Sequence, residues 1–462
     1  MSHLGVDPKV ATLGLTFLMF DDFYLIETNF INRFIERTDL TMYLPFDKVN
    51  NIGFISTRFA GTDGVSLETE KWARVFEKER FHCFYFAGEL DRPPSHSHVV
   101  PAAHFMDPEI RSIFNTAFEC HINGVRPRQL TTKIHDIKEH LKNELYDFIA
   151  KFDIDLLVPE NVLTIPLNIP LGLAITEIIA ETGLPTIAHH HDFFWERQQF
   201  KANAVWDYLN MAFPPHLPPI RHVVISTSAG NQLGLRTGIS GTLIPNVMDF
   251  RHPPKPPDDY ADDVREALGL DPDERLILQP TRVVKRKGIE NAIELVSRLG
   301  IKARLVISHA SGDEGHDYEK RLINYSRRMQ VNTNFVSNII NDRRGTTPNG
   351  RKIYTLQDIY HHADFVTYPS TIEGFGNAFL EAVYFRKPIL VNRYSIYSFD
   401  IKPKGFLAVE IDGYVTDKAV EKTRAILENA HLREKMVETN YALGKKFYSY
   451  EVLHSKLMNL MV

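Results

Sequence analysis

Residues 368–382 read YPSTIEGFGNAFLEA, and this stretch decides the fold prediction. The apolar run that ends at Tyr368 is typical of a buried strand, and the run that begins near Asn377 is typical of a helix. The loop between them contains Gly374 and Gly376, which let a ligand approach the backbone closely. Unpaired N–H groups and the positive dipole end of the helix favour a phosphate or diphosphate at this position.

Two glutamates flank this loop. Glu373 precedes the glycines, and Glu381 lies a little over one turn into the expected helix, so that both can face one pocket. A carboxylate can accept hydrogen bonds from a pair of sugar hydroxyls, and two carboxylates can therefore bind two sugars. The strand before the loop and the helix after it favour this interpretation over a surface helix with two solvated glutamates.

Short apolar runs alternate with amphipathic stretches on both sides of this loop. Near-continuous apolar strands that alternate with helices predict an α/β fold of parallel sheets covered on both faces. Ligands of such sheets bind at the carboxyl ends of the strands, so we expect the site in a cleft between two domains. The expected strands are 51–57, 81–87, 155–159, 185–189, 222–226, 275–279, 303–308, 364–368 and 388–391, and the expected helices are 66–79, 171–182, 289–299, 318–329 and 378–384.

The alternation of strands and helices begins again after a proline-rich stretch at 253–257. We expect this stretch to be stiff and exposed, as a segment at a domain boundary should be. We therefore predict two Rossmann-like, doubly wound domains with a break near residue 240. The closing segment from 416 looks helical. The predicted division is an N-terminal extension at 1–50, a first Rossmann-like domain at 51–240, a second at 241–440 and a C-terminal helix at 441–462 that packs back.

Composition narrows the function classes. The chain has 462 residues, 44% hydrophobic and 24% charged, which excludes a disordered or low-complexity chain. A net charge of −5 lacks the excess of positive charge that sequence-independent binding to nucleic acid requires. Two cysteines, Cys83 and Cys120, indicate a reducing compartment, with a single disulfide as the alternative. The most apolar N-terminal run, 13–20, is too short to span a bilayer, so we predict a cytoplasmic protein without a transmembrane segment. An oligomer is left open.

Residues 189–192 read HHHD and end another expected strand. Histidine clusters bind zinc, but adjacent histidines on a strand point to opposite faces, and no cysteine or carboxylate follows at a matching spacing. We therefore predict no metal, and a buried core histidine is the other alternative. The acidic pair Asp153 and Asp155 opens a strand instead of closing one, which indicates a structural role.

The stretch 368–382 resembles the glutamate–seven residues–glutamate motif of retaining glycosyltransferases with the GT-B fold, in particular family 4. Residues 280–288, PTRVVKRKG, resemble the family's loop whose Arg and Lys bind the donor diphosphate. Residues 244–249, IPNVMD, resemble the segment that opens the second domain, with Val247 where glycine is usual. Residues 59–66, FAGTDGVS, resemble the glycine-rich first loop, although the usual paired glycines are separated here.

The resemblance implies domain roles, a site and a reaction. Residues 51–240 would form the acceptor-side domain and residues 241–440 the nucleotide-sugar-binding domain. Arg282 and Lys287 would bind the diphosphate and, with His191 and Glu373 on the sugar, form the catalytic set. A hexosyl group would move with retention from a UDP-glucose or GDP-mannose type of donor to a hydroxyl of a soluble acceptor such as a sugar or glycerate. No cofactor or metal would be essential, because basic side chains and amides neutralise the leaving group. The remaining donor-binding residues would be Gly64, Asp192, Ser370, Gly374, Phe375, Gly376, Asn377, Ala378 and Glu381.

Other functions stay open at this point. A nicotinamide-dependent oxidoreductase has a similar fold, but the G-x-G-x-x-G fingerprint is absent and the basic loop at 282–287 counts against it. A non-catalytic protein that binds sugar nucleotides is a second alternative, against which the intact set of charged residues argues. A lipid or polysaccharide acceptor is a third. Arg197, Ser226 and the aromatic run at 193–195 are second-rank candidates for the cleft.

Overall fold

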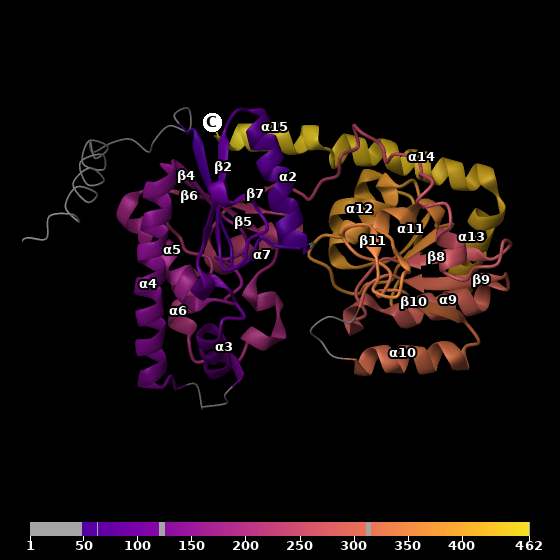
Figure 1. Ribbon diagram of the computed structural model, residues 1–462, viewed down its shortest axis with the longest axis horizontal. Helices are drawn as coiled ribbons and strands as arrows, with labels where there is room; N and C mark the ends of the chain where they lie inside the picture. Colours follow the sequence, from indigo (N-terminus) through magenta and orange to yellow (C-terminus); the bar gives the residue numbers. More distant parts are fainter. Residues whose placement is uncertain (1–48, 62, 120–124, 311–315, 462) are drawn as a thin grey trace, which may run out of the picture. The chain divides into compact units, whose positions relative to one another are not determined.

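The computed structural model describes residues 49–61, 63–119, 125–310 and 316–461 (Figure 1). Cys120, the apolar run at 13–20 and nearly all of the predicted N-terminal extension lie outside these ranges. Within them the chain forms two parallel sheets with helices around each, which confirms the predicted fold class. No helix in the described part of the chain combines the length and the apolar character needed to cross a membrane.

The first sheet has seven strands in the order β3-β2-β1-β4-β5-β6-β7, and every neighbouring pair is parallel. The strand order reverses between β1 and β4, which is the switch point where such sheets bind ligands. Its strands are β1 Asn51–Ile55, β2 His82–Ala87, β3 Ser97–Val99, β4 Leu156–Pro159, β5 Thr186–His190, β6 Ile220–Val224 and β7 Gly241–Leu243. Its main helices are α2 Gly64–Lys78, α3 Pro108–Phe114, α4 Arg128–Phe152, α5 Ile169–Thr182, α6 Trp206–Ala212 and α7 Thr227–Thr237.

The second sheet has six parallel strands in the order β10-β9-β8-β13-β14-β15, with its switch point between β8 and β13. Leu276 and Leu278 pack into one hydrophobic core and Ile277 into another, so this sheet is covered on both faces. Its strands are β8 Arg275–Gln279, β9 Ala303–Ile307, β10 Asn332–Phe335, β13 Phe365–Tyr368, β14 Ile389–Asn392 and β15 Val409–Ile411. Its helices are α8 Val264–Ala267, α9 Ile289–Leu299, α10 Asp317–Arg328, α11 Leu356–His362, α12 Asn377–Tyr384 and α13 Asp417–Glu428, and a short hairpin pairs β11 Gly345–Thr346 with β12 Lys352–Ile353.

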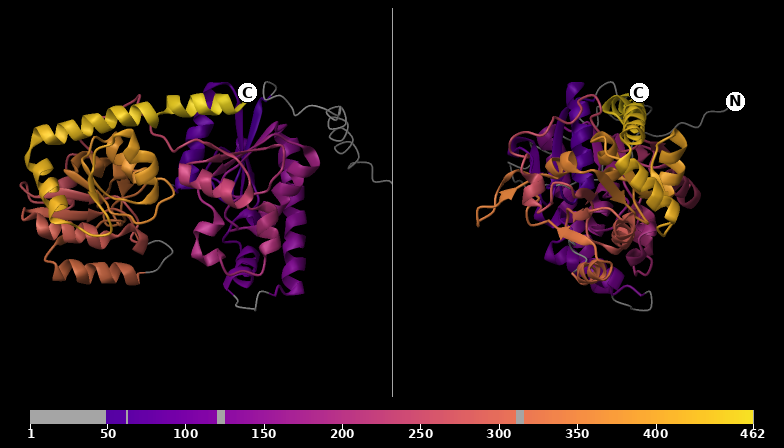
Figure 2. Two further views of the ribbon diagram at one scale, coloured as in Figure 1. Left: turned by 180° about the vertical axis from the view of Figure 1, so that it is seen from behind. Right: turned by 90° about the vertical axis from the view of Figure 1, so that its right-hand side faces the viewer.

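The closing segment is helical, as predicted. The helix α14 Ala430–Phe447 contacts α12 and α13, and α15 Tyr450–Met461 contacts α2 (Figure 2). Leu453 and Leu457 are buried in the hydrophobic core that also contains Ile52 of β1. The last helix of the chain therefore packs back onto the first sheet.

Several element bounds differ from the predicted ones. β6 begins at Ile220 and ends at Val224, because Ser226 is used as the cap of α7 and accepts a hydrogen bond from the amide of Ala229 at 3.2 Å. β7 pairs with β6, so the first sheet extends past the boundary predicted near residue 240. The long helix α4 was not predicted. Asp155 accepts hydrogen bonds from the amides at the start of β1, in keeping with the structural role expected for this residue.

A buried histidine pair joins β5 and β6 and leads to a prediction about acid stability. His190 Nε2 and His222 Nδ1 lie 2.8 Å apart, and burial lowers the pKa of His222 from 6.5 to about 4. In the unfolded chain this histidine regains its ordinary pKa, so the unfolded state takes up a proton first as the pH falls. We expect the free energy of unfolding to lose up to about 3 kcal/mol from His222 between pH 7 and pH 4.

Urea unfolding across this pH range checks the expectation. In His222→Gln the group is absent, and the decline of stability with acid should be shallower by that amount. Parallel curves for the wild type and the variant would show that His222 does not titrate differently in the two states.

Candidate active site

Two predicted catalytic side chains meet in the second sheet. Lys287 lies in the turn after β8, and Glu373 lies in the loop after the neighbouring strand β13. Lys287 Nζ donates a hydrogen bond to Glu373 Oε1 at 2.5 Å, and Arg286 Nη1 lies 3.4 Å from the other carboxylate oxygen. The side chains of Lys287 and Glu373 are only 10% and 9% exposed. A charged pair is therefore held away from bulk water at the carboxyl edge of the sheet.

The electrostatics of this pair keep the carboxylate ionised. Burial alone would raise the pKa of Glu373, but Lys287 and then Arg286 outweigh burial, and the pKa lies below its ordinary value. Burial also lowers the pKa of Lys287, which the attraction of Glu373 only partly offsets. Glu373 is thus an anion available to hydrogen-bond hydroxyl groups, and Lys287 depends on it to stay charged.

The two loops fit together through a glycine. Gly288 has a φ of +59°, and a Cβ there would lie 2.6 Å from the carbonyl oxygen of Pro369. The amide of Thr371 donates to the carbonyl of Arg286 at 2.8 Å. The turn at 285–287 and the loop at 369–374 therefore pack as one unit, which sets the position of Lys287 beside Glu373.

Arg282 adds a second cation beside this unit. It is exposed and has no ion-pair partner within the described part of the chain. His309, which follows β9, has its pKa lowered by burial and by the charges of Arg282 and Lys287. His309 was not among the predicted site residues, although its place directly after a predicted strand was a usable signal. The positive charges of Arg282 and Lys287 repel each other near His309. A bound anion would reduce this repulsion.

The start of α12 offers the expected backbone amides. Gly376 precedes the helix with a φ of +133°, and no side chain caps the first turn. Ser370 is buried nearby, and its carbonyl accepts from the side-chain amide of Asn392 at 3.1 Å. Phe375 is buried against Tyr448, with ring centroids 5.6 Å apart, so its side chain is part of the hydrophobic core. Ala378 is 9% exposed in the same first turn.

Gly376 is expected to be intolerant of any side chain. A Cβ at this position would lie 2.3 Å from the hydroxyl of Tyr394, which donates to the carbonyl of Phe375. We expect Gly376→Ala to lower the free energy of unfolding by about 1–3 kcal/mol, measured by urea unfolding. In the control variant Gly234→Ala, the added Cβ meets an atom only at 3.8 Å inside α7, so stability should be unchanged or slightly raised. Equal effects in the two variants would contradict the tight fit.

Glu381 lies one turn further into α12. It accepts a hydrogen bond from the hydroxyl of Tyr360 at 3.1 Å. Burial raises the pKa of Glu381, opposed by Tyr360, Lys71 and Lys287. Lys71 belongs to α2 and donates to the carbonyl of Val247 at 2.6 Å. The Glu381 carboxylate thus interacts electrostatically with Lys71, which belongs to a helix of the first sheet, and with Lys287, which follows a strand of the second.

Residues that follow strands of the first sheet lie close to the loop at 369–376 and to the start of α12. An added Cβ on Gly374 would lie 3.3 Å from the carbonyl oxygen of His191, and one on Gly64 would lie 3.7 Å from Asn377 Nδ2. Asn377 also accepts a hydrogen bond from the side chain of Asn246 at 2.8 Å. The structure therefore brings the predicted residues at the ends of β5, β13 and the start of α2 into one neighbourhood.

His191 and Asp192 are held from the end of β4. Asn161 Oδ1 accepts from the backbone amide of His191, and Asn161 Nδ2 donates to Asp192 Oδ1, both at 3.0 Å. Arg197 Nε donates to the other oxygen of Asp192 at 2.6 Å. Asp192 is thus already paired on both of its carboxylate oxygens, by Asn161 and by Arg197.

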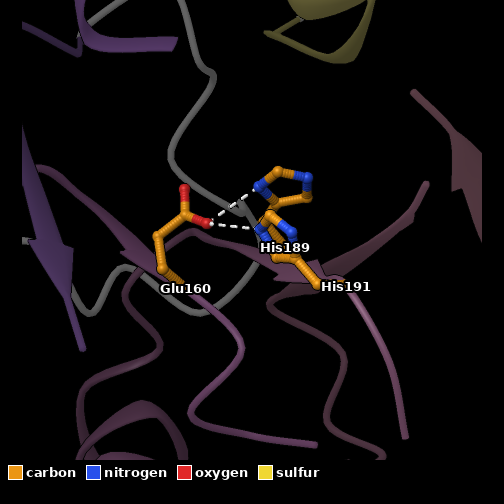
Figure 3. Close-up of side chains that lie close together, drawn as sticks. All are labelled: Glu160, His189 and His191. Carbon is orange, nitrogen blue, oxygen red and sulfur yellow. Dashed lines mark hydrogen bonds and ion pairs between the residues drawn. The ribbon is translucent and has the colours of Figure 1, made fainter. Parts of the chain in front are cut away.

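The histidine run places two rings on one side of β5. His189 and His191 face Glu160 (Figure 3). His190 instead contacts His222, as strand alternation predicts. Ligand atoms of Glu160, His189 and His191 lie within 4.8 Å of one another, a spacing that could hold a metal ion. No carboxylate was predicted for this set, because Glu160 precedes His189 by 29 residues and only the sheet brings the two together. Its place directly after β4 was the available signal.

A family model and several curated relatives match this chain. The model described as Glycosyl transferases group 1 matches residues 261–443. Mannosylglucosylglycerate synthase from Thermotoga maritima is 31% identical over 439 residues, covering 88% of this chain and 98% of the relative. The protein of the same name from Petrotoga mobilis is 30% identical over 380 residues, covering 78% of this chain and 86% of the relative.

Solved structures agree on the fold. Sucrose-phosphate synthase from Thermosynechococcus elongatus superposes with a TM-score of 0.62 at 15% identity, covering 89% of this chain and 98% of that one. Anabaena HepE in complex with UDP and glucose superposes with a TM-score of 0.60 at 14% identity, with the same coverage. Because it matches a relative at 31% identity over nearly the whole of that relative, the chain belongs to the glycosyl transferases group 1 family and is a retaining GT-B glycosyltransferase that uses a nucleotide-sugar donor.

Proposed function

We propose that this glycosyltransferase moves a mannosyl group from a nucleotide-diphosphate mannose to a hydroxyl of glucosylglycerate. The observation that carries the proposal is the match to 98% of the length of a relative named mannosylglucosylglycerate synthase. A second relative with the same name matches over 86% of its length. A small charged acceptor also agrees with the predicted cytoplasmic location. The first domain would bind this acceptor and the second domain the donor.

The donor diphosphate would be bound by Arg282, Lys287 and the amides at the start of α12. Arg282 has no ion-pair partner within the described residues, so its charge is available to an anion. Negative charge grows on the departing nucleoside diphosphate, and cations and amides that are already in position stabilise that charge. Glu381 would accept hydrogen bonds from the ribose hydroxyls. No step in this scheme requires a metal ion.

The transferred hexose would be held by Glu373 and His191. The bond between C1 and the diphosphate oxygen breaks, and the acceptor oxygen bonds to C1 on the same face, so the configuration is retained. The acceptor proton passes to the departing phosphate oxygen, which balances the exchange. Glu373, kept ionised by Lys287, favours the positive charge that develops on the sugar ring.

A donor and acceptor matrix tests this proposal. GDP-mannose and UDP-glucose are each mixed with glucosylglycerate, with glucosylglycerol, which lacks the carboxylate, and with the phosphorylated acceptor glucosyl-3-phosphoglycerate. Mass spectrometry detects the product, and NMR of the anomeric centre gives its configuration. We expect the highest kcat/KM for GDP-mannose with glucosylglycerate and an α-linked product. Equal use of glucosylglycerol would contradict recognition of the glycerate, and a β-linked product would contradict retention.

A further inference from the structure

Glu160 is a fully buried carboxylate at the end of β4 to which neither the family motifs nor the proposed function gives a role. It is 0% exposed, and its backbone bridges to His189 of β5. Its Oε2 atom lies 2.8 Å from His189 Nδ1 and 3.4 Å from His191 Nε2. Figure 3 shows both imidazole rings directed at this one oxygen.

We propose that Glu160 is the positioning residue of His191: it accepts a hydrogen bond from the Nε2–H group of His191 and so leaves Nδ1 as the unprotonated nitrogen. One oxygen that faces two ring nitrogens must act as an acceptor for at least one of them, because a carboxyl hydroxyl has a single hydrogen to donate. If both histidines donate to Glu160, His189 carries its proton on Nδ1 and His191 carries its proton on Nε2. The proposal rests on the proposed role of His191 at the hexose, and it assigns that histidine as an acceptor for a sugar hydroxyl.

The surroundings fix the geometry of this cluster. The ring of His189 stacks on Trp72 with centroids 4.1 Å apart and lies 4.4 Å from the ring of His191, so packing restrains both rings beside Glu160. Asn161, the next residue, accepts from the backbone amide of His191 at 3.0 Å. Asn161 has a φ of +58°, a conformation that asparagine tolerates better than most residues, and the chain turns sharply there. The pair 160–161 therefore fixes both the ring and the backbone of His191.

A metal ion at the same three groups is the competing interpretation, and the outer hydrogen bonds argue against it. A histidine that binds metal through Nδ1 carries its proton on Nε2 and nearly always donates it to a carboxylate, carbonyl or water. His189 Nε2 is buried and has no hydrogen-bond partner among the described residues. A buried N–H without an acceptor is costly, whereas an unpaired ring lone pair is the smaller loss. The hydrogen-bonded cluster therefore fits these surroundings better than a metal site does.

Nitrogen NMR of the imidazole rings tests the proposal directly. The full chain carries 20 histidines, so the His191 signals are assigned by their loss in His191→Gln. In the wild type we expect His191 to show a protonated Nε2 and an unprotonated Nδ1. A protonated Nδ1 in the wild type would overturn the proposal, as would a spectrum that changes when EDTA removes a bound metal.

Kinetics of Glu160→Gln give the second readout. A glutamine can present either its oxygen or its NH₂ group to the ring, so the tautomer bias should weaken. We expect kcat/KM to fall about 10–100-fold while the Kd for the nucleoside diphosphate stays unchanged. Glu160→Asp keeps a carboxylate and should recover part of both the tautomer and the rate. Glu196→Gln is the matched control. The side chain of Glu196 accepts a hydrogen bond from the backbone amide of Phe193 and does not contact His191.

The outcomes separate this proposal from the proposed function. If Glu160→Gln lowers only the thermal midpoint and moves neither the tautomer nor kcat/KM, the positioning role is wrong. If the tautomer is as expected but His191→Ala transfers the hexose at the wild-type rate, then the role of His191 in the proposed function fails while the hydrogen bond from Glu160 stands.

Discussion

Glu373→Ala is expected to lower kcat/KM for hexosyl transfer by about 10³-fold. The substitution removes the carboxylate proposed to hold the hexose, and it also leaves Lys287 buried without its partner at 2.5 Å. Burial already lowers the pKa of Lys287, so loss of Glu373 would lower it further and reduce the charge on the diphosphate site. Glu373→Gln keeps hydrogen-bonding atoms without the charge and should lie between the two. Steady-state kinetics with the accepted donor measure the effect.

A buried pair far from the proposed site provides the matched control. Glu274 is 1% exposed and pairs with Arg304 at 3.1 Å, at the opposite end of β8 from Lys287. Glu274→Ala should lower the thermal midpoint because it leaves the partly buried Arg304 without its carboxylate partner, yet it should leave kcat/KM unchanged. If Glu373→Ala behaved as Glu274→Ala does, Glu373 would be a structural residue only.

The second large effect is expected for Arg282→Ala, which should lower kcat/KM by about 10²-fold or more and weaken binding of the free nucleoside diphosphate. Arg282 is exposed and lacks an ion-pair partner within the described residues, so its loss should leave the fold intact. The loss should diminish as salt is added, since screening weakens the wild-type contact with the anion.

Lys285→Ala is the control for Arg282→Ala. Lys285 is also exposed and lies three residues away, in the turn that leads to Lys287. We expect its kcat/KM to stay within about twofold of the wild type, because surface charges outside a site contribute little. Isothermal titration with the nucleoside diphosphate and steady-state kinetics check both variants. Equal losses for the two would indicate a general attraction of the donor instead of a specific contact.

Local patterns were sufficient to predict much of the second sheet. β8 and α9 have the predicted bounds, 275–279 and 289–299, and β13 and α12 differ from the prediction by one residue at their starts. These segments combine a strong apolar period with glycines at their ends, and both signals lie within a few residues of the element they define. The loop 368–382 could be placed for the same reason.

Long-range contacts set the limits of prediction. The 25-residue helix α4 was not predicted. Its apolar residues are interspersed with many charged residues of both signs, so its amphipathic period is hard to recognise in the sequence. The hydrogen bonds between Glu160 and the two histidines, His189 and His191, join residues about 30 positions apart, and only the pairing of β4 with β5 brings them together. His309 likewise joins Arg282 and Lys287 only when β8 and β9 pair. Motifs located the donor loop, whereas these supporting groups required the sheets.

A crystal structure with an intact nucleotide sugar is the most direct test of the proposed site. We predict the diphosphate within hydrogen-bond distance of Arg282, Lys287 and the amides at 376–378, with the ribose on Glu381 and the hexose between Glu373 and His191. A donor bound elsewhere, or one whose diphosphate touches neither Arg282 nor Lys287, would contradict the assignment.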